Sequence, residues 1–160
     1  MVAWVQHPYA EPVEYLSRIY ARAALHHRST DRLLRQLIST NTPWERLAGF
    51  SRAVRVGKAV YVAGTTASNE SGDLQGGQDA YAQTVYVLHK IEAALGAAGA
   101  TRSDVVRTRI YVARMEDWQA AARAHGEFFG DIRPANTLVQ VAGLIGDYLV
   151  EIEADAVVGD

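Results

Sequence analysis

The sequence has 160 residues, of which 49% are hydrophobic and 21% charged, and its net charge is −2. This composition excludes a chain that is disordered throughout, and the length fits one domain with a short addition. The absence of cysteine excludes disulfide scaffolds, thiolate nucleophiles and Cys-ligated clusters. No apolar run is long enough to span a membrane, and residues 1–14 lack the pattern of a secretory signal. We therefore expect a cytoplasmic protein with no membrane association. Its slight net acidity does not favour nucleic acid as a partner.

Residues 1–36 differ from the rest of the chain in charge. They carry five arginines against three acidic residues, whereas residues 37–160 carry 11 basic and 15 acidic residues. Apolar residues at positions 16, 19, 20 and 23 have helical spacing, and Ser29–Asp31 can cap a second short helix that runs through Gln36. We predict that residues 1–36 form an N-terminal helical extension, either a docking appendage without chemistry or an arm that grips a partner subunit. Residues 37–160 then form the main domain.

The main domain begins with strand signals. Residues 51–56 and 58–64 are short apolar-rich runs joined at Gly57 and Lys58, which predicts a hairpin. Residues 68–77 form a polar, glycine-rich loop. A helix is predicted over residues 79–98, because positions 81, 85, 88, 92 and 95 lie on one stripe that is apolar except for Glu92. Gly99 follows where a helix commonly ends.

The second half of the domain continues this alternation of strands and helices. Residues 105–113 alternate, so Thr108, Ile110 and Val112 are predicted on one face and Arg107, Arg109 and Tyr111 on the other. A helix over 116–129 and strands over 137–142 and 149–158 complete the order β-β-α-β-α-β-β. This order predicts an α+β fold in which a mixed sheet carries both helices on one face. The opposite face mixes apolar and charged residues, so we expect a homo-oligomer to cover it.

Three carboxylates alternate along the last predicted strand. Glu151, Glu153 and Asp155 share one face, since side chains repeat with a period of two along a strand. Like charges in a row need compensation, which Arg107 and Arg109 could supply as a structural ladder of ion pairs. The alternative is that one carboxylate lacks a full partner, has a raised pKa and serves as an acid or base.

Histidines and known motifs indicate neither a metal nor a nucleotide cofactor. His26 and His27 are adjacent and diverge on a helix, and the other histidines lack metal-ligand spacing. His125 lies on the apolar stripe of its helix, which favours a hydrogen-bonded core residue. The sequence contains no GxSxG, Walker or GxGxxG motif. We therefore expect no cofactor.

Several segments together resemble the RidA/YjgF family of reactive-intermediate deaminases. They are RVGKAVYVAGTTA, DVVRTRIYVARMEDW, RPANTLVQVAGL and VEIEADAV, in this order and at this spacing within residues 38–160. The resemblance implies a chorismate-mutase-like α+β fold and a homotrimer with three small-molecule clefts between subunits. It also implies the hydrolysis of enamines and imines, such as 2-aminoacrylate, to a keto acid and ammonia without a cofactor. Some members of the family have been called endoribonucleases and others chaperone-like.

The resemblance assigns site residues by position. The family's glutamate on the last strand falls on Glu151, and the glycine that ends the second strand falls on Gly64. We group Thr65, the next residue, with the ligand-binding positions. Three positions depart from the family pattern: Asn136 replaces the arginine that holds the substrate carboxylate, Phe50 replaces a tyrosine, and Leu138 stands where cysteine is common.

The missing arginine changes the expected chemistry. A guanidinium pairs bidentately with a carboxylate, whereas Asn136 can donate a hydrogen bond but brings no charge. Arg52 or Arg133 could supply the charge, or each could serve only in surface or rim ion pairs. We predict that Glu151 activates water as the catalytic residue and that the ligand-binding residues are Phe50, Arg52, Gly64, Thr65, Arg133 and Asn136.

Two other functions stay open at this point. The first is a non-catalytic, small-ligand-binding or regulatory trimer of the same fold. The second is ribonuclease activity, against which the net charge of −2 and the lack of a paired His/Lys constellation argue.

Overall fold

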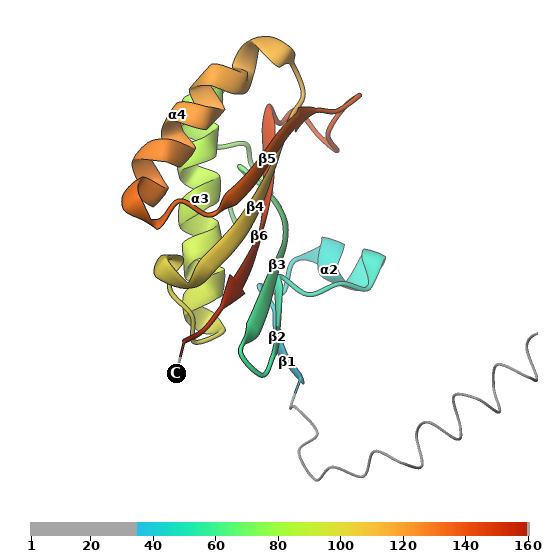
Figure 1. Ribbon diagram of the computed structural model, residues 1–160. Coiled ribbons are helices and arrows are strands. Elements are labelled where there is room, and N and C mark those ends of the chain that lie inside the picture. Colours follow the sequence, from blue (N-terminus) through green and yellow to red (C-terminus); the bar gives the residue numbers. More distant parts are fainter. Residues whose placement is uncertain (1–34, 160) are drawn as a thin grey trace, which may run out of the picture. The chain divides into compact units, whose positions relative to one another are not determined.

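The computed structural model describes residues 35–159, which form one mixed sheet with helices packed on it (Figure 1). The helices are α2 (Pro43–Ala48), α3 (Ala80–Ala97) and α4 (Trp118–Phe129), with short 3₁₀ turns at Arg102–Asp104, Met115–Asp117 and Gly130–Ile132. The strands are β1 (Arg35–Ile38), β2 (Ala53–Val56), β3 (Ala59–Thr66), β4 (Val105–Val112), β5 (Ala135–Gln140) and β6 (Val150–Val157).

The sheet has six strands in the order β1-β2-β3-β6-β4-β5. Neighbouring strands are antiparallel except β4 and β5, which are parallel. Strand β6 comes last in the sequence but lies inside the sheet, between β3 and β4. The α+β fold expected from the sequence is confirmed.

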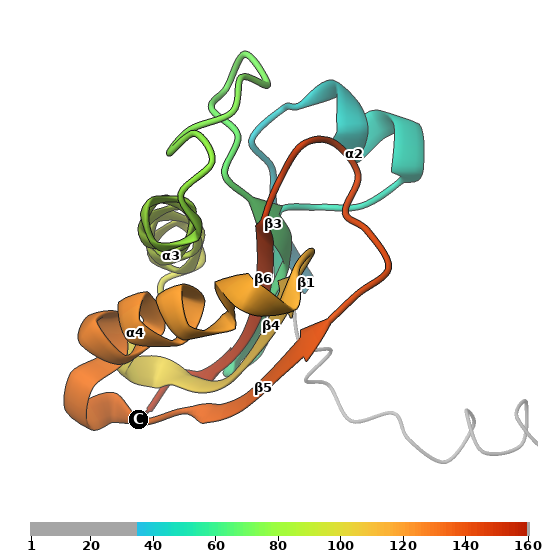
Figure 2. The ribbon, with the colours of Figure 1, turned by 90° about the horizontal axis from the view of Figure 1, so that it is seen from above.

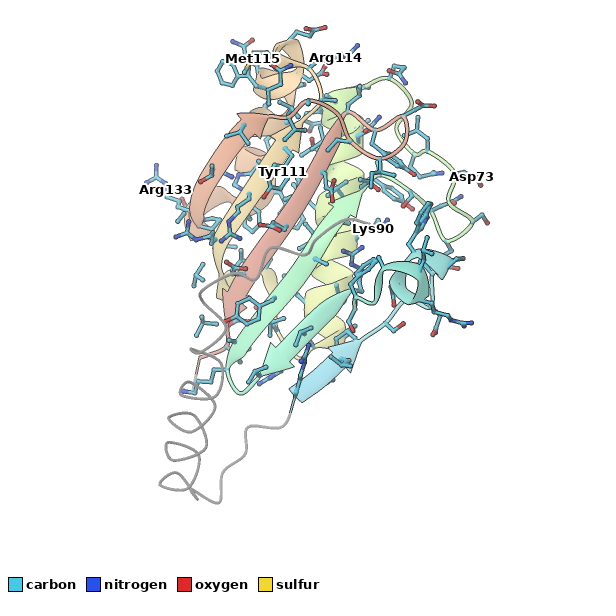
Figure 3. All side chains as sticks on the ribbon, turned by 90° about the vertical axis from the view of Figure 1, so that its right-hand side faces the viewer. Asp73, Lys90, Tyr111, Arg114, Met115 and Arg133 are labelled. Carbon is cyan, nitrogen blue, oxygen red and sulfur yellow. The ribbon has the colours of Figure 1, made fainter. Side chains whose placement is uncertain are left out.

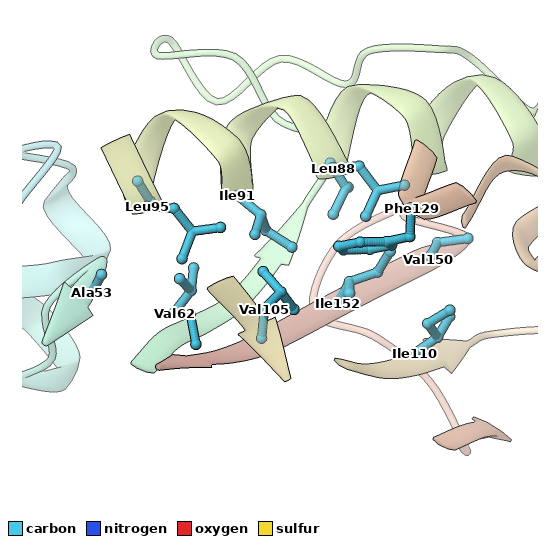
Figure 4. Close-up of a cluster of buried hydrophobic side chains, with 14 of the residues drawn as sticks. Ala53, Val62, Leu88, Ile91, Leu95, Val105, Ile110, Phe129, Val150 and Ile152 are labelled. Atoms are coloured by element: carbon cyan, nitrogen blue, oxygen red, sulfur yellow. The ribbon is translucent and has the colours of Figure 1, made fainter. Parts of the chain in front are cut away.

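Helices α3 and α4 cover the same face of the sheet (Figures 1 and 2). The core lies between them and the strands, where Leu88, Ile91 and Leu95 of α3 meet Val62 and Ile152 of the sheet (Figure 4). All five side chains are at most 3% exposed, and each large apolar side chain buried in this way contributes about 1.5–3 kcal/mol. This packing holds the opposite face of β6 in a fixed position.

Helix α3 is rotated from the orientation that the sequence predicted. Asp79 caps its first turn by accepting hydrogen bonds from the backbone N–H groups of Tyr81 and Ala82, and Gly99 follows its end with φ +72°. Tyr81, Val85 and Glu92 are only partly buried. The buried residues are Ala80, Gln83, Thr84, Val87, Leu88, Ile91, Ala94 and Leu95.

Two elements were absent from the sequence prediction. Strand β1 pairs with β2 and includes Arg35 and Gln36, so the expectation of a helix through Gln36 is wrong for these two residues. Helix α2 begins at Pro43 and ends at Ala48, and Gly49 follows as its C-cap with a φ of +68° that suits glycine. The helical extension predicted for the residues before 35 lies outside the described residues.

The face of the sheet without helices is open in the single chain. Tyr61 and Val157 on this face are 53% and 49% exposed, and Val139 of the edge strand β5 is 42% exposed. Figure 3 views this face, with Tyr111 on β4 and Arg133 beside β5. None of the helices in the described part of the chain combines the length and apolar character that crossing a membrane requires.

Candidate active site

The three carboxylates of β6 lie on the open face, as the strand periodicity predicted, while Val150, Ile152 and Ala154 are buried on the other face. Two of the three are paired. Arg109 places Nη1 2.9 Å from Glu153 Oε1 and Nη2 3.3 Å from Asp155 Oδ2. The Tyr111 hydroxyl also donates to Glu153, at 3.2 Å. The structural interpretation of the ladder therefore holds for Glu153 and Asp155.

Glu151 is the exception in this row. Within residues 35–159, no hydrogen bond or ion pair reaches its carboxylate, although the residue is only partly exposed. Burial raises the pKa of Glu151, the positive charge of Arg52 opposes this shift, and the negative charge of Glu153 adds to it. A carboxylate with a raised pKa and free oxygens is suited to exchanging protons with a ligand.

Gly64 lies directly against Glu151. The pairing of β3 with β6 is irregular between Val62 and Thr65, so the backbone bulges at this glycine. A Cβ built on Gly64 would clash with Glu151 Oε1 and stand 3.1 Å from Glu151 Cδ. Only glycine allows the carboxylate to approach the backbone this closely.

Arg52 is fixed beside the same bulge. Its Nη2 donates to the carbonyl oxygens of Ala63 and Gly64, at 2.6 Å each, and its guanidinium lies 5.9 Å from the Phe50 ring centre. Burial lowers the pKa of Arg52, and the charges of Glu45 and Glu151 oppose that shift. Arg52 Nε is buried without a hydrogen-bond partner in the described residues. Arg52 therefore supports the backbone bulge and partly balances the negative charge of Glu151.

Lys90 lies close enough to Arg52 for their charges to interact, and the sequence analysis missed it. From α3, its ammonium group donates to Thr66 O at 3.0 Å, Ser68 O at 2.6 Å and Ser68 Oγ at 3.1 Å (Figure 3). Burial and then the charge of Arg52 lower its pKa from 10.5 to about 8. The only sequence signal was its rarity, since the chain contains two lysines.

The other predicted ligand-binding residues, Thr65, Asn136 and Arg133, do not join this cluster in the single chain. Thr65 is fully buried, pairs with Ile152 in the sheet and donates its hydroxyl to Ala63 O at 2.8 Å. Asn136 pairs with Thr108, on the helix-covered side of the sheet. Arg133 is exposed beside the edge strand, with φ +50°. One chain thus brings together Glu151, Gly64, Arg52 and Phe50, but neither Asn136 nor Arg133.

His125 lies on α4 beside the buried residues Ala121, Ala124 and Phe129, whereas Trp118 of the predicted stripe is 44% exposed. His125 Nε2 lies 2.9 Å from Thr108 Oγ1, and its ring packs 4.6 Å from that of Phe129. The predicted hydrogen bond is confirmed, but His125 is only partly buried and lies at the margin of the core. In residues 35–159, no group of three His, Asp or Glu side chains is placed to hold a metal ion.

A family model described as endoribonuclease L-PSP matches residues 40–158. Among curated proteins, an uncharacterized protein of Streptomyces coelicolor is 40% identical over 121 residues, which cover 74% of this chain and 89% of that protein. The 3-aminoacrylate deaminase RutC of Acinetobacter baylyi is 35% identical over 110 residues, which cover 69% of this chain and 87% of that protein.

Solved structures show the same relationship. A member of the YjgF/YER057c/UK114 family from Mycobacterium tuberculosis is 48% identical and has a TM-score of 0.71; the match covers 78% of this chain and all of that one. The YjgF protein of Escherichia coli is 29% identical and has a TM-score of 0.67; the match covers 76% of this chain and 98% of that one.

Proposed function

The chain belongs to the RidA/YjgF family, the family of the endoribonuclease L-PSP model, and from this premise we propose that it hydrolyses a reactive imine or enamine to a carbonyl compound and ammonia. The observation that carries the proposal is the unpaired, partly buried carboxylate of Glu151 against the backbone of Gly64. The name of the RutC relative, a 3-aminoacrylate deaminase, supports the same type of reaction.

In the proposed mechanism, Glu151 acts first as a base and then as an acid. An enamine becomes an imine when its carbon gains a proton and its nitrogen loses one. Glu151 takes a proton from water as the water oxygen bonds to the imine carbon, and it returns this proton to the nitrogen, which gives a neutral carbinolamine. Glu151 then takes the proton of the carbinolamine hydroxyl and delivers it to the nitrogen, and the carbon–nitrogen bond breaks as the carbonyl forms and ammonia leaves. A carboxylate with a raised pKa exchanges protons more readily near neutral pH than an ordinary glutamate does.

The complete site is proposed to form between subunits of a homotrimer. Asn136 belongs to the opposite side of the sheet from Glu151, so both can line one ligand site only if a second copy contributes one of them. Five of the six β5 residues are exposed, and Tyr61 and Val157 leave apolar surface on the open face. Such surface is usually covered in an assembly. Sedimentation or light scattering measures the oligomeric state directly.

The natural ligand is proposed to differ from 2-aminoacrylate at its carboxylate. Arg52 donates to two backbone carbonyls, and Arg133 is exposed at the edge of the chain. Asn136 itself has no charge. If no cation replaces the arginine of the family, a carboxylate ligand loses a charge-assisted pair that contributes about 1.5–3 kcal/mol.

A coupled deamination assay tests the proposal. An amino-acid oxidase generates 2-imino acids and an amine oxidase generates imines without a carboxylate, and product release is followed with and without the protein. We expect acceleration that Glu151→Gln abolishes and that Glu153→Gln retains, because Glu153 is held in the ion pair with Arg109. Equal activity of the wild type and Glu151→Gln would overturn the proposed mechanism.

The alternative function is a non-catalytic, ligand-binding trimer. The replacement of the family's arginine by Asn136 favours this alternative, because a site without that arginine can still bind a ligand and yet lose the reaction. It predicts that a small metabolite raises the melting temperature while no imine in the panel is hydrolysed faster.

A further inference from the structure

Three side chains form a hydrogen-bonded row from α4 through β4 to β5. His125 Nε2 lies 2.9 Å from Thr108 Oγ1, and Asn136 Nδ2 donates to the same hydroxyl oxygen at 2.9 Å. Thr108 is fully buried, whereas Asn136 is exposed and its Oδ1 has no hydrogen-bond partner in residues 35–159. The row therefore joins a histidine behind the sheet to the surface position where the family carries its arginine.

The proton positions in this row follow from the chemistry of a hydroxyl. Thr108 has one proton to donate, and its oxygen already accepts from Asn136. His125 Nε2 can accept this proton only while that nitrogen is unprotonated, and the hydroxyl then donates to His125 while it accepts from Asn136. Burial lowers the pKa of His125, which favours this neutral state.

Protonation of His125 releases the Thr108 proton. Both ring nitrogens of an imidazolium are donors, so Nε2–H would donate to Thr108 Oγ1. The hydroxyl proton, displaced from His125, can then be donated to Asn136, provided that the amide rotates to offer Oδ1. In that arrangement the surface presents the amide N–H₂ group in place of the carbonyl oxygen.

We propose that His125 and Thr108 are positioning residues that set which end of the Asn136 amide faces the ligand. With neutral His125 the carbonyl oxygen faces outward, so the site takes a ligand that presents an N–H or O–H donor, such as a carboxamide, and disfavours a carboxylate. The ligand half of this inference rests on the proposed function, whereas the hydrogen-bonded row does not depend on it.

No charged group takes part in the row. Burial is the one cause of the pKa shift of His125, so neighbouring charges do not act on it appreciably. The charged and titratable groups on the surrounding elements do not point at His125. Those on the helices contact other residues: Tyr81 contacts Glu127 and Arg123, His89 contacts Glu92, and Arg102 lies over Phe128. Arg107 and Arg109 lie on the opposite face of β4, and Arg133 is exposed.

Nuclear magnetic resonance of the full chain tests the row without any substrate. The side-chain amide of Asn136 and the ring of His125 are followed from about pH 8 to about pH 5, the range in which histidines titrate. We expect both to shift with the same midpoint in the wild type and in Thr108→Ser, and the Asn136 shift to vanish in Thr108→Val and His125→Phe. An Asn136 amide that does not respond to His125, or that responds unchanged in Thr108→Val, would overturn the inference.

Two matched probes test the ligand class. Pyruvamide and pyruvate differ only in a carboxamide against a carboxylate. Above the midpoint of His125, we expect pyruvamide to shift the Asn136 amide signal at lower concentration than pyruvate does. Equal or stronger perturbation by pyruvate, or none by pyruvamide, would overturn the ligand assignment, and neither result depends on turnover.

Discussion

Gly64→Ala tests the close approach between β3 and the Glu151 carboxylate. The new Cβ would clash with Glu151 Oε1 and stand 3.1 Å from its Cδ, whereas ordinary contacts begin at 3.4 Å. The atoms in the way are the end of a flexible side chain, and the φ of Gly64 lies outside the range that disfavours alanine. The substitution should therefore move the carboxylate and leave the fold in place.

The expected magnitudes differ for stability and activity. A displaced side chain costs about 0.5–1.5 kcal/mol when it leaves its rotamer. The reduced freedom of the unfolded chain returns about 0.4–1 kcal/mol. The free energy of unfolding should thus change by less than ~1 kcal/mol, a shift in melting temperature of a few degrees. A carboxylate displaced by ~1 Å should lower turnover by about 10²-fold.

Thermal unfolding and the coupled deamination assay measure the two effects. Gly96→Ala is the matched control, because it lies in α3 with nothing within 4 Å of the added Cβ. It should keep full activity and become slightly more stable. Full activity in a folded Gly64→Ala protein would refute the reasoning, because it would show that the observed position of Glu151 is not required.

Three further predictions concern charges at or near the site. Because folding raises the pKa of Glu151, ionisation of this carboxyl lowers the stability of the folded protein as pH rises. Glu151→Gln should therefore have a higher melting temperature than the wild type at neutral pH. A melting temperature that stays higher below pH 4.5 would contradict this explanation. Lys90 should titrate near pH 8 by the ¹³Cε signals of the chain's two lysines, assigned with Lys58→Arg; a midpoint near 10.5 would refute its burial. Asn136→Arg should increase turnover of 2-imino acids relative to imines without a carboxylate, and an unchanged ratio would show that position 136 does not meet the carboxylate.

Strand periodicity predicted correctly which side chains of β4 and β6 lie on each face of the sheet. In a sheet with one buried face, alternating apolar residues must occupy that face, so the residues between them lie on the open face. It thereby identified the acidic row, and the possibility that one carboxylate lacks a partner. Which carboxylate this is depends on the reach of Arg109 across to β6. The alternation offered Arg109 as a partner for the row, but only the resemblance pointed to Glu151.

The rotation of α3 shows where a polarity pattern misleads. Gln83 and Thr84 are polar but fully buried. Gln83 donates to Gly77 O and accepts from Leu149 N, and Thr84 donates to Ala80 O. Polar side chains whose hydrogen bonds are satisfied by the backbone can lie in a core, so the buried stripe included residues that a count of apolar positions assigns to solvent.

The remaining differences arise from contacts with little sequence signal. Strand β1 has three exposed residues out of four, so no alternation marks it. Lys90 binds backbone oxygens at residues 66 and 68, and backbone acceptors leave no trace in residue identity. Asn136 and Glu151 share a family site by position, yet the topology puts them on opposite sides of the sheet.

The place of β6 inside the sheet has a consequence for how the chain folds during synthesis. The β1–β2–β3 unit and the β4–β5 pair have no direct pairing with each other, and β6 alone bridges them. The sheet therefore cannot close until Val157 has left the ribosome, and the earlier strands expose their unpaired edges until then. The strand that completes the core also delivers Glu151, so a nascent chain has no candidate active site before it has a finished sheet.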